Sequence, residues 1–330
     1  MAKEKNMNEF SYDVLTLDCE KETRRLTAFV AEAVGRRLHK QGAVIGLSGG
    51  VDSSVTAALC VRALGPDKVI GLLMPERDSH PDTLRLSQLV GESLKIRTIH
   101  RDITPILTGL GFYQEMTSCL QEVVPEYSEG WKWKISASEL SEDRVFTFFW
   151  LVVQSPQGEI IKKRLPADKL LRMIALSNFK QRTRKMLEYH YADRFNYAVS
   201  GTSNLLETDQ GFFVKLGDGA GDFKPIAHLY KSQIYQLGNY LGLPAAITKR
   251  QPTSDIHPFA QGQDEFFFLL PYQQMDACLY GEKNGIPPES VARAIGLGVE
   301  RVRLMYKQLA HRRTANEYLN LPALYPEPQD

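Results

Sequence analysis

Apolar and polar positions follow two alternating periods over residues 19–99. Short apolar runs such as Ala43 to Leu47 are each followed by a longer stretch whose apolar residues recur at helical spacing. This pattern predicts strands at 43–47, 68–74 and 96–99, and helices at 19–40, 53–64 and 81–95. Because buried strands that alternate with helices form parallel sheets, we expect an α/β fold with a Rossmann-like parallel sheet and helices on both faces.

The middle of the chain departs from this alternation, because its residues are typical of β-strands joined by a turn. Residues 145–153 are mainly β-branched and aromatic, 155–158 (SPQG) are typical of a turn, and 159–162 begin a return strand. This order predicts an inserted β-hairpin. Beyond it we expect a long basic helix at 167–195, a buried strand at 197–200, an ordered loop at 208–224 and mainly helices from residue 229.

Composition narrows the class of protein. Forty Lys and Arg residues nearly balance 39 Asp and Glu residues, for a net charge of +1, which argues against a broad nucleic-acid surface but not against a local anion pocket. The four cysteines lack CxxC spacing, so free thiols in a reducing cytoplasm are expected. The longest apolar run is too short to cross a bilayer, and the N-terminus has no secretory character. We therefore expect a cytoplasmic protein without a membrane or nucleic-acid partner.

The segment from Ser48 to Ser54 (SGGVDSS) carries the first candidate chemistry. Its glycines allow close approach of the backbone to a ligand, and the following helix N-terminus presents unpaired N–H groups, a combination that suits phosphate. The segment is neither a Walker loop nor a GxGxxG fingerprint. A carboxylate at Asp52 beside phosphate implies an intervening cation, most naturally Mg²⁺. The simpler alternative is that Asp52 only caps the helix.

Several motifs further along the chain indicate which family of proteins this loop belongs to. The segment SGGVDSS resembles the pyrophosphate-binding motif of the N-type ATP pyrophosphatases, which implies an adenine nucleotide alpha hydrolase-like fold. More motifs follow in order: MPER at 74–77, NFKQRTR at 178–184, GTSNLLE at 201–207, GFFVKLGDG at 211–219, LYK at 229–231, PTSD at 252–255, and His311-Arg312. With them the chain closely resembles the ammonia-dependent NAD synthetases from about residue 20 to residue 316, apart from the hairpin.

This resemblance implies a role for each matching position. Contacts with ATP are implied for Gly46, Leu47, Ser48, Gly49, Gly50, Val51, Asp52, Ser53, Thr202, Lys231 and Thr253. Contacts with nicotinic acid adenine dinucleotide are implied for Arg182, Lys215, Asp222, His311 and Arg312. Asp52 and Glu207 are the implied Mg²⁺ ligands, and together with Lys231 they form the implied catalytic group. Arg312 departs from the family pattern, in which lysine is frequent.

The chemistry of these residues agrees with such roles but leaves alternatives open. Lys215 and Lys231 can neutralise phosphate, yet an isolated lysine is more often a solvated surface charge. Glu207 could be a helix-start carboxylate, and His311 could belong to a basic surface run. Arg182 and Arg184 stand two positions apart on one helix and do not face the same way, so we expect one to bind ligand and the other to be structural.

The implied reaction is amidation of nicotinic acid adenine dinucleotide by ammonia, driven by ATP, with NAD, AMP and pyrophosphate as products and a homodimer as the assembly. Asp218 or Asp222 is a candidate base for ammonium, and no glutaminase segment is recognised. Two rivals remain: another ATP pyrophosphatase that activates a different oxygen, and a nucleotide-binding sensor without chemistry.

For the domain organisation we expect a flexible arm at 1–18, a single domain at 19–316 and a C-terminal tail at 317–330. Family members usually lack an equivalent of residues from about 122 to 166, which we interpret as an insertion. Its role stays open between covering the site, extending a dimer contact, docking a partner and inert decoration.

Overall fold

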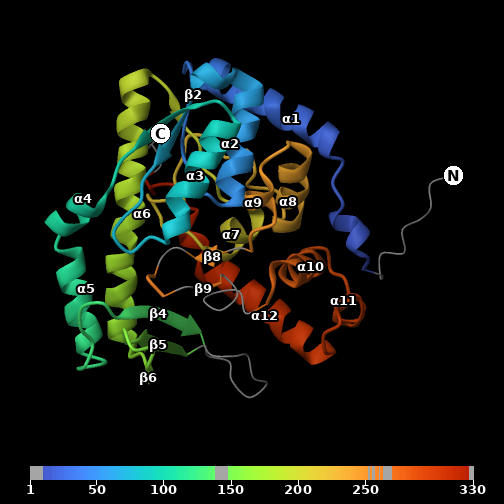
Figure 1. The fold of residues 1–330 in the computed structure, drawn as a ribbon. Coiled ribbons are helices and arrows are strands. Elements are labelled where there is room, and N and C mark those ends of the chain that lie inside the picture. Colours follow the sequence, from blue (N-terminus) through green and yellow to red (C-terminus); the bar gives the residue numbers. More distant parts are fainter. Residues whose placement is uncertain are drawn as a thin grey trace.

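The computed structural model describes residues 10–137, 148–251, 253–254, 257–259, 261–262 and 270–326. Within these ranges the centre of the molecule is a four-stranded parallel sheet with the strand order β3-β2-β1-β7 (Figure 1). The strands are β1 (Ala43–Gly46), β2 (Val69–Leu73), β3 (Arg97–His100) and β7 (Ala198–Val199). The predicted parallel sheet is therefore confirmed.

Helices cover both faces of this sheet, as predicted. On one face lie α1 (Cys19–Ala31) with its π-helical continuation Glu32–Arg37, α2 (Val51–Leu64), α3 (Pro81–Ser93), α8 (Lys231–Tyr240) and α9 (Ala245–Thr248). On the other lie α4 (Thr104–Gly109), α5 (Phe112–Gln121) and α6 (Ala167–Phe195). In β1, Ile45 packs on the first face and Val44 on the second, because successive strand residues point to opposite sides.

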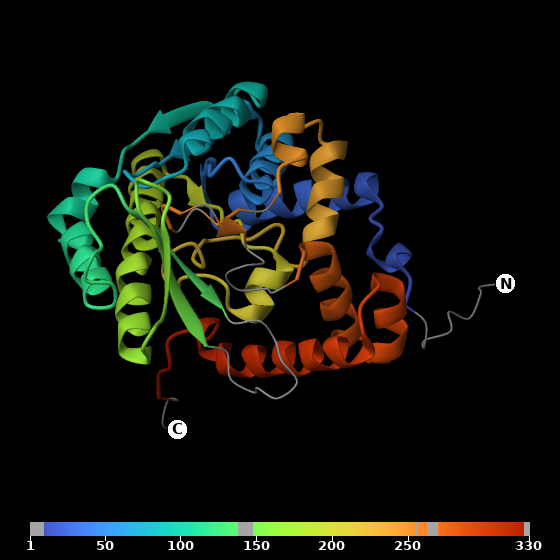
Figure 2. The ribbon, with the colours of Figure 1, turned by 60° about the horizontal axis from the view of Figure 1, so that its bottom comes forward.

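The segment predicted as an insertion contains a small antiparallel sheet that packs beside α5 and α6 (Figure 2). It contains β4 (Lys132–Ala137), β5 (Phe149–Gln154) and β6 (Ile160–Arg164). The predicted hairpin is confirmed as the β5–β6 pair, although 145–147 lie outside the described residues. Strand β4 was not predicted. Its Trp133 and Ile135 are buried in the core while Lys132 is exposed, so its alternation was present in the sequence.

The C-terminal third forms a separate helical layer. It consists of α7 (Leu205–Gln210), α10 (Tyr272–Lys283), α11 (Pro288–Ile295) and α12 (Val299–Ala315) around a third apolar cluster. Short elements complete the described chain: 3-10 turns at Tyr12–Leu15, Pro66–Lys68 and Glu317–Leu319, and the pair β8 (Thr253–Ser254) and β9 (Gln261–Gly262).

The expectation of a flexible arm over 1–18 is wrong for the part from Phe10 onward. Phe10 and Leu15 are buried in the cluster formed by α10, α11 and α12. The backbone N–H of Leu17 also donates to Gln236 of α8, at 2.9 Å. Burial of these two apolar side chains removes hydrophobic surface from water and so favours docking of the segment.

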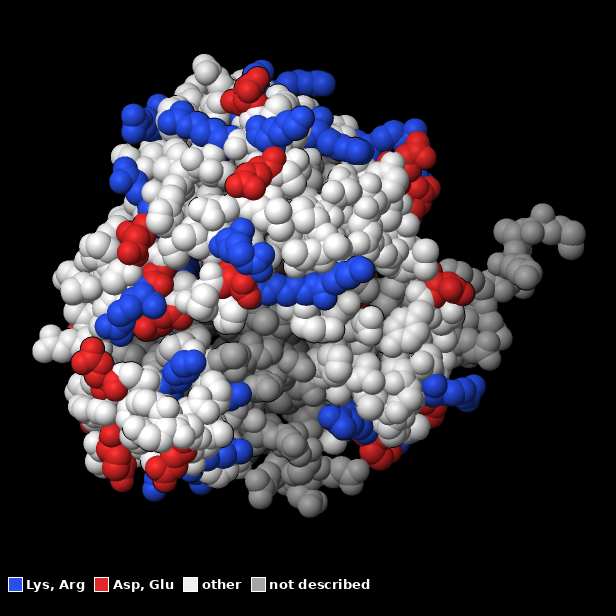
Figure 3. All heavy atoms as spheres, viewed as in Figure 1, with Lys and Arg blue, Asp and Glu red and all other residues white. Residues whose placement is uncertain are grey.

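The surface agrees with the near-neutral composition. On the face shown in Figure 3, Lys and Arg side chains are interspersed with Asp and Glu, and no large region carries one sign. Over the stretches of chain that the structure describes, none of the helices combines the length and the apolar character that a membrane crossing needs.

Candidate active site

The SGGVDSS segment forms the turn between β1 and α2. Gly50 is the N-cap of α2, and no side chain caps this helix start, so its first N–H groups are available to a ligand. Gly49 has φ +72, and a Cβ there would lie 2.8 Å from Cβ of Leu86. Glycine is therefore required at 49 both by backbone conformation and by the close contact with α3.

A cleft of about 260 Å³ opens beside this turn, at the carboxyl ends of β1 and β2. Open α/β sheets bind their ligands at this edge. The predicted ligand-contacting residues that line the cleft are Gly46, Leu47, Ser48, Gly50, Val51, Asp52, Ser53, Thr202, Glu207 and Lys231. Residues up to 185 positions apart in sequence thus meet in one cleft. Gly49 shapes the turn without being among its lining residues.

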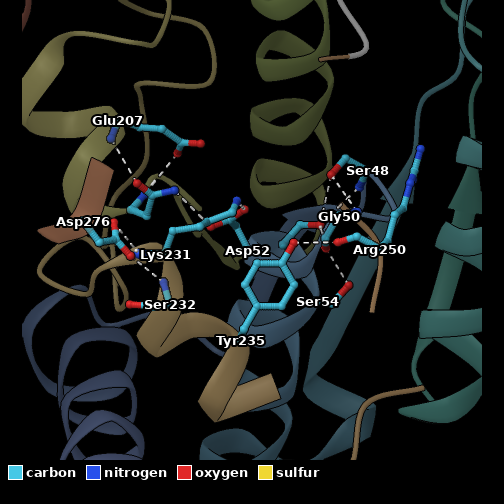
Figure 4. A network of polar contacts seen from close by, with 12 residues as sticks. Ser48, Gly50, Asp52, Ser54, Glu207, Lys231, Ser232, Tyr235, Arg250 and Asp276 are labelled. Atoms are coloured by element: carbon cyan, nitrogen blue, oxygen red, sulfur yellow. Dashed lines mark hydrogen bonds and ion pairs between the residues drawn. The ribbon is translucent and has the colours of Figure 1, made fainter. Parts of the chain in front are cut away.

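Three charged side chains from different elements gather near the start of α2. Lys231 forms an ion pair with Asp52, and the Asn204 amide donates to Asp52 at 3.1 Å (Figure 4). Asn204 also caps α7, because its Oδ1 accepts from the Glu207 N–H at 3.0 Å while the Glu207 carboxylate accepts from the Asn204 N–H at 3.1 Å. A single asparagine therefore connects both predicted metal ligands.

The electrostatics of this group are strongly coupled. Burial, and after it the negative charge of Asp52, raises the pKa of Glu207 well above its usual range. Burial alone would lower the pKa of Lys231, but the carboxylates of Asp52 and Glu207 raise it above its ordinary value. Glu207 therefore binds a proton readily while Lys231 is the cation beside the two carboxylates, and a metal ion at this place would instead favour the charged form of Glu207.

The carboxyl groups of Asp52 and Glu207 fit a bound divalent cation, which would keep both of them charged. Across the described ranges, no three His, Cys, Asp or Glu side chains gather closely enough to hold a metal by themselves. Mg²⁺ commonly binds through one or two carboxylates, with substrate phosphates and water completing its shell. Asp52 and Glu207 therefore fit such an ion in the presence of a phosphate ligand.

The start of the helix that carries Lys231 is held by a neighbouring carboxylate, that of Asp276 (Figure 4). It is the first residue of α8, and the backbone N–H of Ser232 donates to Asp276 of α10 at 2.7 Å. The Asp276 side chain is fully buried, and this burial raises its pKa to about 6. Asp276 was missed in the sequence, because no local motif links it to Lys231.

The residues predicted for the second substrate lie outside the lining of the cleft. Arg182 is exposed and donates to the Lys215 carbonyl at 3.3 Å, while the Lys215 ammonium donates to the Tyr318 carbonyl at 2.8 Å. Asp222 accepts from the Val199 N–H at 2.7 Å. Arg182 and Lys215 are thus neighbours, whereas the Asp222 carboxylate binds the backbone of β7.

The remaining predicted residues lie on α12 and β8. His311 and Arg312 belong to the last turns of α12, and burial lowers the pKa of Arg312 to about 10. Thr253 belongs to β8, and its side chain lies outside the described residues. The ligand contacts expected at these three positions stay predictions.

Several residues that line the cleft were not assigned from the sequence. On α6 they are Gln181, Arg184, Lys185 and Glu188, and elsewhere Tyr235 and Arg250, whereas Asp218, a predicted candidate base, also lines the cleft. Of the two arginines compared above, it is Arg184 that lines the cleft, where its Nε donates to the Met74 carbonyl at 3.1 Å. The spacing 181, 184, 185, 188 marks one helix face, so a polar stripe on α6 was the available signal.

A ligand cleft at the carboxyl edge of a parallel sheet, with an uncapped helix start and a lysine beside two carboxylates, defines a nucleotide-binding α/β enzyme. The NAD synthase family model matches residues 22–124 and 154–316, and the chain belongs to this family. The predicted family, fold and enzyme class, a ligase, are thereby confirmed.

Individual relatives agree with this assignment over almost the whole chain. An NH(3)-dependent NAD(+) synthetase from Rhizobium meliloti is 47% identical over 318 residues, which cover 96% of this chain and 95% of the relative. Another from Mesorhizobium japonicum is 46% identical over 93% of this chain and 96% of its own length. The solved NH3-dependent NAD synthetase from Campylobacter jejuni superposes with a TM-score of 0.62 at 25% identity, covering 94% of this chain and all of that one.

Proposed function

We propose that this protein catalyses the last step of NAD biosynthesis, in which ammonia amidates nicotinic acid adenine dinucleotide at the expense of ATP. The products are NAD, AMP and pyrophosphate. The observation that carries this proposal is the convergence of the SGGVDSS turn, Asp52, Glu207 and Lys231 on one cleft. Its support is the near full-length similarity to proteins named NH(3)-dependent NAD(+) synthetases.

In the first step, an oxygen of the nicotinate carboxylate attacks the α-phosphorus of ATP. The bond between the α-phosphorus and the bridging oxygen breaks, and pyrophosphate leaves with the electron pair, so that an acyl-adenylate remains. The N–H groups at the start of α2 and the Lys231 ammonium would stabilise the negative charge of the leaving group. Positioning and electrostatics are therefore expected to supply most of the rate acceleration.

Asp52 and Glu207 would hold Mg²⁺ when ATP is bound. The ion supplies positive charge to the phosphate oxygens and so relieves their repulsion of the two carboxylates. Asn204 fixes both carboxylates relative to each other through its contacts with Asp52 and with the Glu207 backbone.

In the second step, the nitrogen of ammonia attacks the acyl carbon, loses one proton, and AMP leaves with the electrons of the broken carbon–oxygen bond. Asp218 is our candidate for accepting that proton. It lines the cleft, and burial raises the pKa of its carboxyl group, which makes it a better base than an exposed aspartate. Asp222, the other candidate, is not among the residues that line the cleft, and its carboxylate accepts hydrogen bonds from the Val199 N–H and the Tyr189 hydroxyl.

We further propose that two copies of the chain associate through α6. Leu171 and Met186 are 67% and 55% exposed, and Leu216, beside Arg182 and Lys215, is 72% exposed. An apolar surface of this kind commonly marks a protein–protein contact. The dinucleotide substrate would then bind close to the contact between the two copies. Four free cysteines support function in a reducing cytoplasm.

A substrate test separates this proposal from its rivals. The purified protein is incubated with ATP, Mg²⁺, ammonium and nicotinic acid adenine dinucleotide, and NAD, AMP and pyrophosphate are measured. We expect all three in equal amounts. Turnover of a different carboxylate or nucleobase in a substrate panel would identify another ATP pyrophosphatase, and ATP binding without pyrophosphate release would identify a sensor. Full turnover with glutamine after rigorous removal of ammonia would contradict free ammonia as the donor.

A further inference from the structure

A buried ion pair on α6 faces the cleft and has no part in the mechanism above. The Lys185 ammonium donates to Glu188 Oε2 at 2.6 Å, and both residues are 6% exposed. Both also line the cleft. Burying two charges carries a desolvation penalty that their attraction only partly offsets.

This pair joins no separate elements, since its members stand three positions apart on one helix. Another buried pair on α6 is different, because Lys180 binds Glu76 of the loop that follows β2, at 2.6 Å. That second pair fastens two parts of the fold together. Lys185 and Glu188 cannot connect two parts of the fold in this way, because both lie on α6. Their position in the cleft instead suits a ligand-binding role.

Glu188 presents one carboxylate oxygen to the beginning of the phosphate turn. Its Oε1 lies 2.7 Å from the place where a Cβ on Gly46 would stand. Oε2 is occupied by Lys185, whereas no donor to Oε1 is found among the residues that the structure describes. Burial raises the pKa of Glu188, but the Lys185 ammonium and then Arg184 oppose this effect and favour the charged carboxylate. The negative charge of Asp218 instead raises the pKa of Glu188.

The place of this oxygen indicates which part of a nucleotide it meets. The phosphates belong at the uncapped start of α2, because that is where the free N–H groups lie. The nucleoside must then extend over the carboxyl ends of β1 and β2, where Gly46, Leu73 and Met74 line the cleft. Glu188 lies next to this region, because its carboxylate is close to Gly46.

We propose that Glu188, oriented by Lys185, reads the nucleoside of ATP by accepting a hydrogen bond from one of its donors. The donor is a ribose hydroxyl or the exocyclic amine of the adenine, and both offer an N–H or O–H group to a carboxylate. Glu188 is thus a specificity-determining residue. The inference rests on the proposed function only in taking ATP as the nucleotide of this cleft.

Nucleotide analogues test this assignment and identify the donor. Binding of ATP, 2′-deoxy-ATP, 3′-deoxy-ATP and inosine triphosphate is measured by calorimetry with Mg²⁺ and without the second substrate. For the unmodified protein, we expect one analogue to bind about 10- to 100-fold more weakly than ATP, the loss typical of a hydrogen bond to a charged group. Glu188→Ala should weaken ATP by a similar factor and abolish the preference for ATP over that analogue.

Matched variants separate this role from a purely structural one. Glu188→Gln keeps the shape of the side chain and one acceptor oxygen, so it should bind ATP better than Glu188→Ala. Asp168→Asn changes an exposed carboxylate near the start of the same helix and should behave like the unmodified protein. Thermal unfolding monitors the fold of each variant.

The outcomes distinguish this inference from the proposed function. If Glu188→Ala keeps the original preference among all four nucleotides, or if the unmodified protein has no preference, Glu188 does not read the nucleoside. Glu188-dependent nucleotide preference in a protein that forms no NAD would uphold the inference and refute the function. Formation of NAD by the unmodified protein, together with an unchanged nucleotide preference in Glu188→Ala, would uphold the proposed function and refute the inference.

Discussion

At the scale of single residues, the site is built from side chains that hold one another. Asp52 accepts from Lys231 and Asn204, and Asn204 in turn fixes the first turn of α7. Asp52 and its neighbours in the turn could be predicted because they are consecutive in sequence. Asn204, Asp276 and Glu188 could not, since their roles depend on contacts across 152, 44 and 142 positions, respectively, with Asp52, Ser232 and Gly46.

Replacement of Asn204 separates its two functions. Asn204→Ser should leave α7 nearly as stable, because serine is also a good N-cap, but it removes the amide that reaches Asp52. We expect turnover to fall about 10-fold or more, in line with a lost hydrogen bond to a charged group. Asn204→Ala should lose the same activity and in addition about 1 kcal/mol of stability.

Steady-state kinetics and urea unfolding of the two variants check this prediction. Equal turnover for Asn204→Ser and the unmodified protein would mean that the contact with Asp52 has no catalytic importance.

Gly49 gives a second prediction at this scale. Gly49→Ala places a Cβ at positive φ and 2.8 Å from Leu86, so it should destabilise the protein by about 1–3 kcal/mol and raise the KM for ATP. Gly50→Ala is the control, because its Cβ would meet only the Ser48 hydroxyl at 3.2 Å. Thermal unfolding compares the two variants, and a smaller loss for Gly49→Ala would contradict the conformational argument.

At the scale of elements, periodicity predicted most of the fold. The three early strands, the helices between them, the 167–195 helix and the β5–β6 hairpin all follow from residue patterns. Strand β4 was missed although lysines alternate with buried apolar residues at its start, a pattern that is visible in the sequence. The N-terminal segment was misjudged because docking of Phe10 and Leu15 depends on helices about 260 to 300 residues away in sequence.

The small sheet of β4, β5 and β6 contributes buried residues to the core, which argues against an inert decoration. Trp133 is 3% exposed between α5 and α6, so Trp133→Ala should destabilise the protein by about 3–5 kcal/mol. Lys132→Ala, on the exposed side of the same strand, should change stability by less than about 0.5 kcal/mol. Urea unfolding measures both, and similar small losses would show that the sheet is energetically separate from the domain.

At the scale of the whole molecule, exposed apolar residues on and beside α6 bear on the assembly. The exposed apolar residues of α6 and the adjoining Leu216 lead us to expect a particle of about twice 37.3 kDa. Leu171→Glu and Met186→Glu should convert it to monomers and weaken binding of the dinucleotide. Light scattering checks the mass, and a fully active monomer would contradict the proposed dimer.

The central claim is that the substrate carboxylate, and not water, attacks the α-phosphorus of ATP in the cleft formed by Asp52, Glu207 and Lys231. The most direct test uses nicotinic acid adenine dinucleotide whose carboxylate carries heavy oxygen, with mass spectrometry of the products. We predict that each AMP released carries one labelled oxygen, that NAD keeps the other, and that Asp52→Ala releases neither product. Unlabelled AMP, or ADP with inorganic phosphate, would contradict the account.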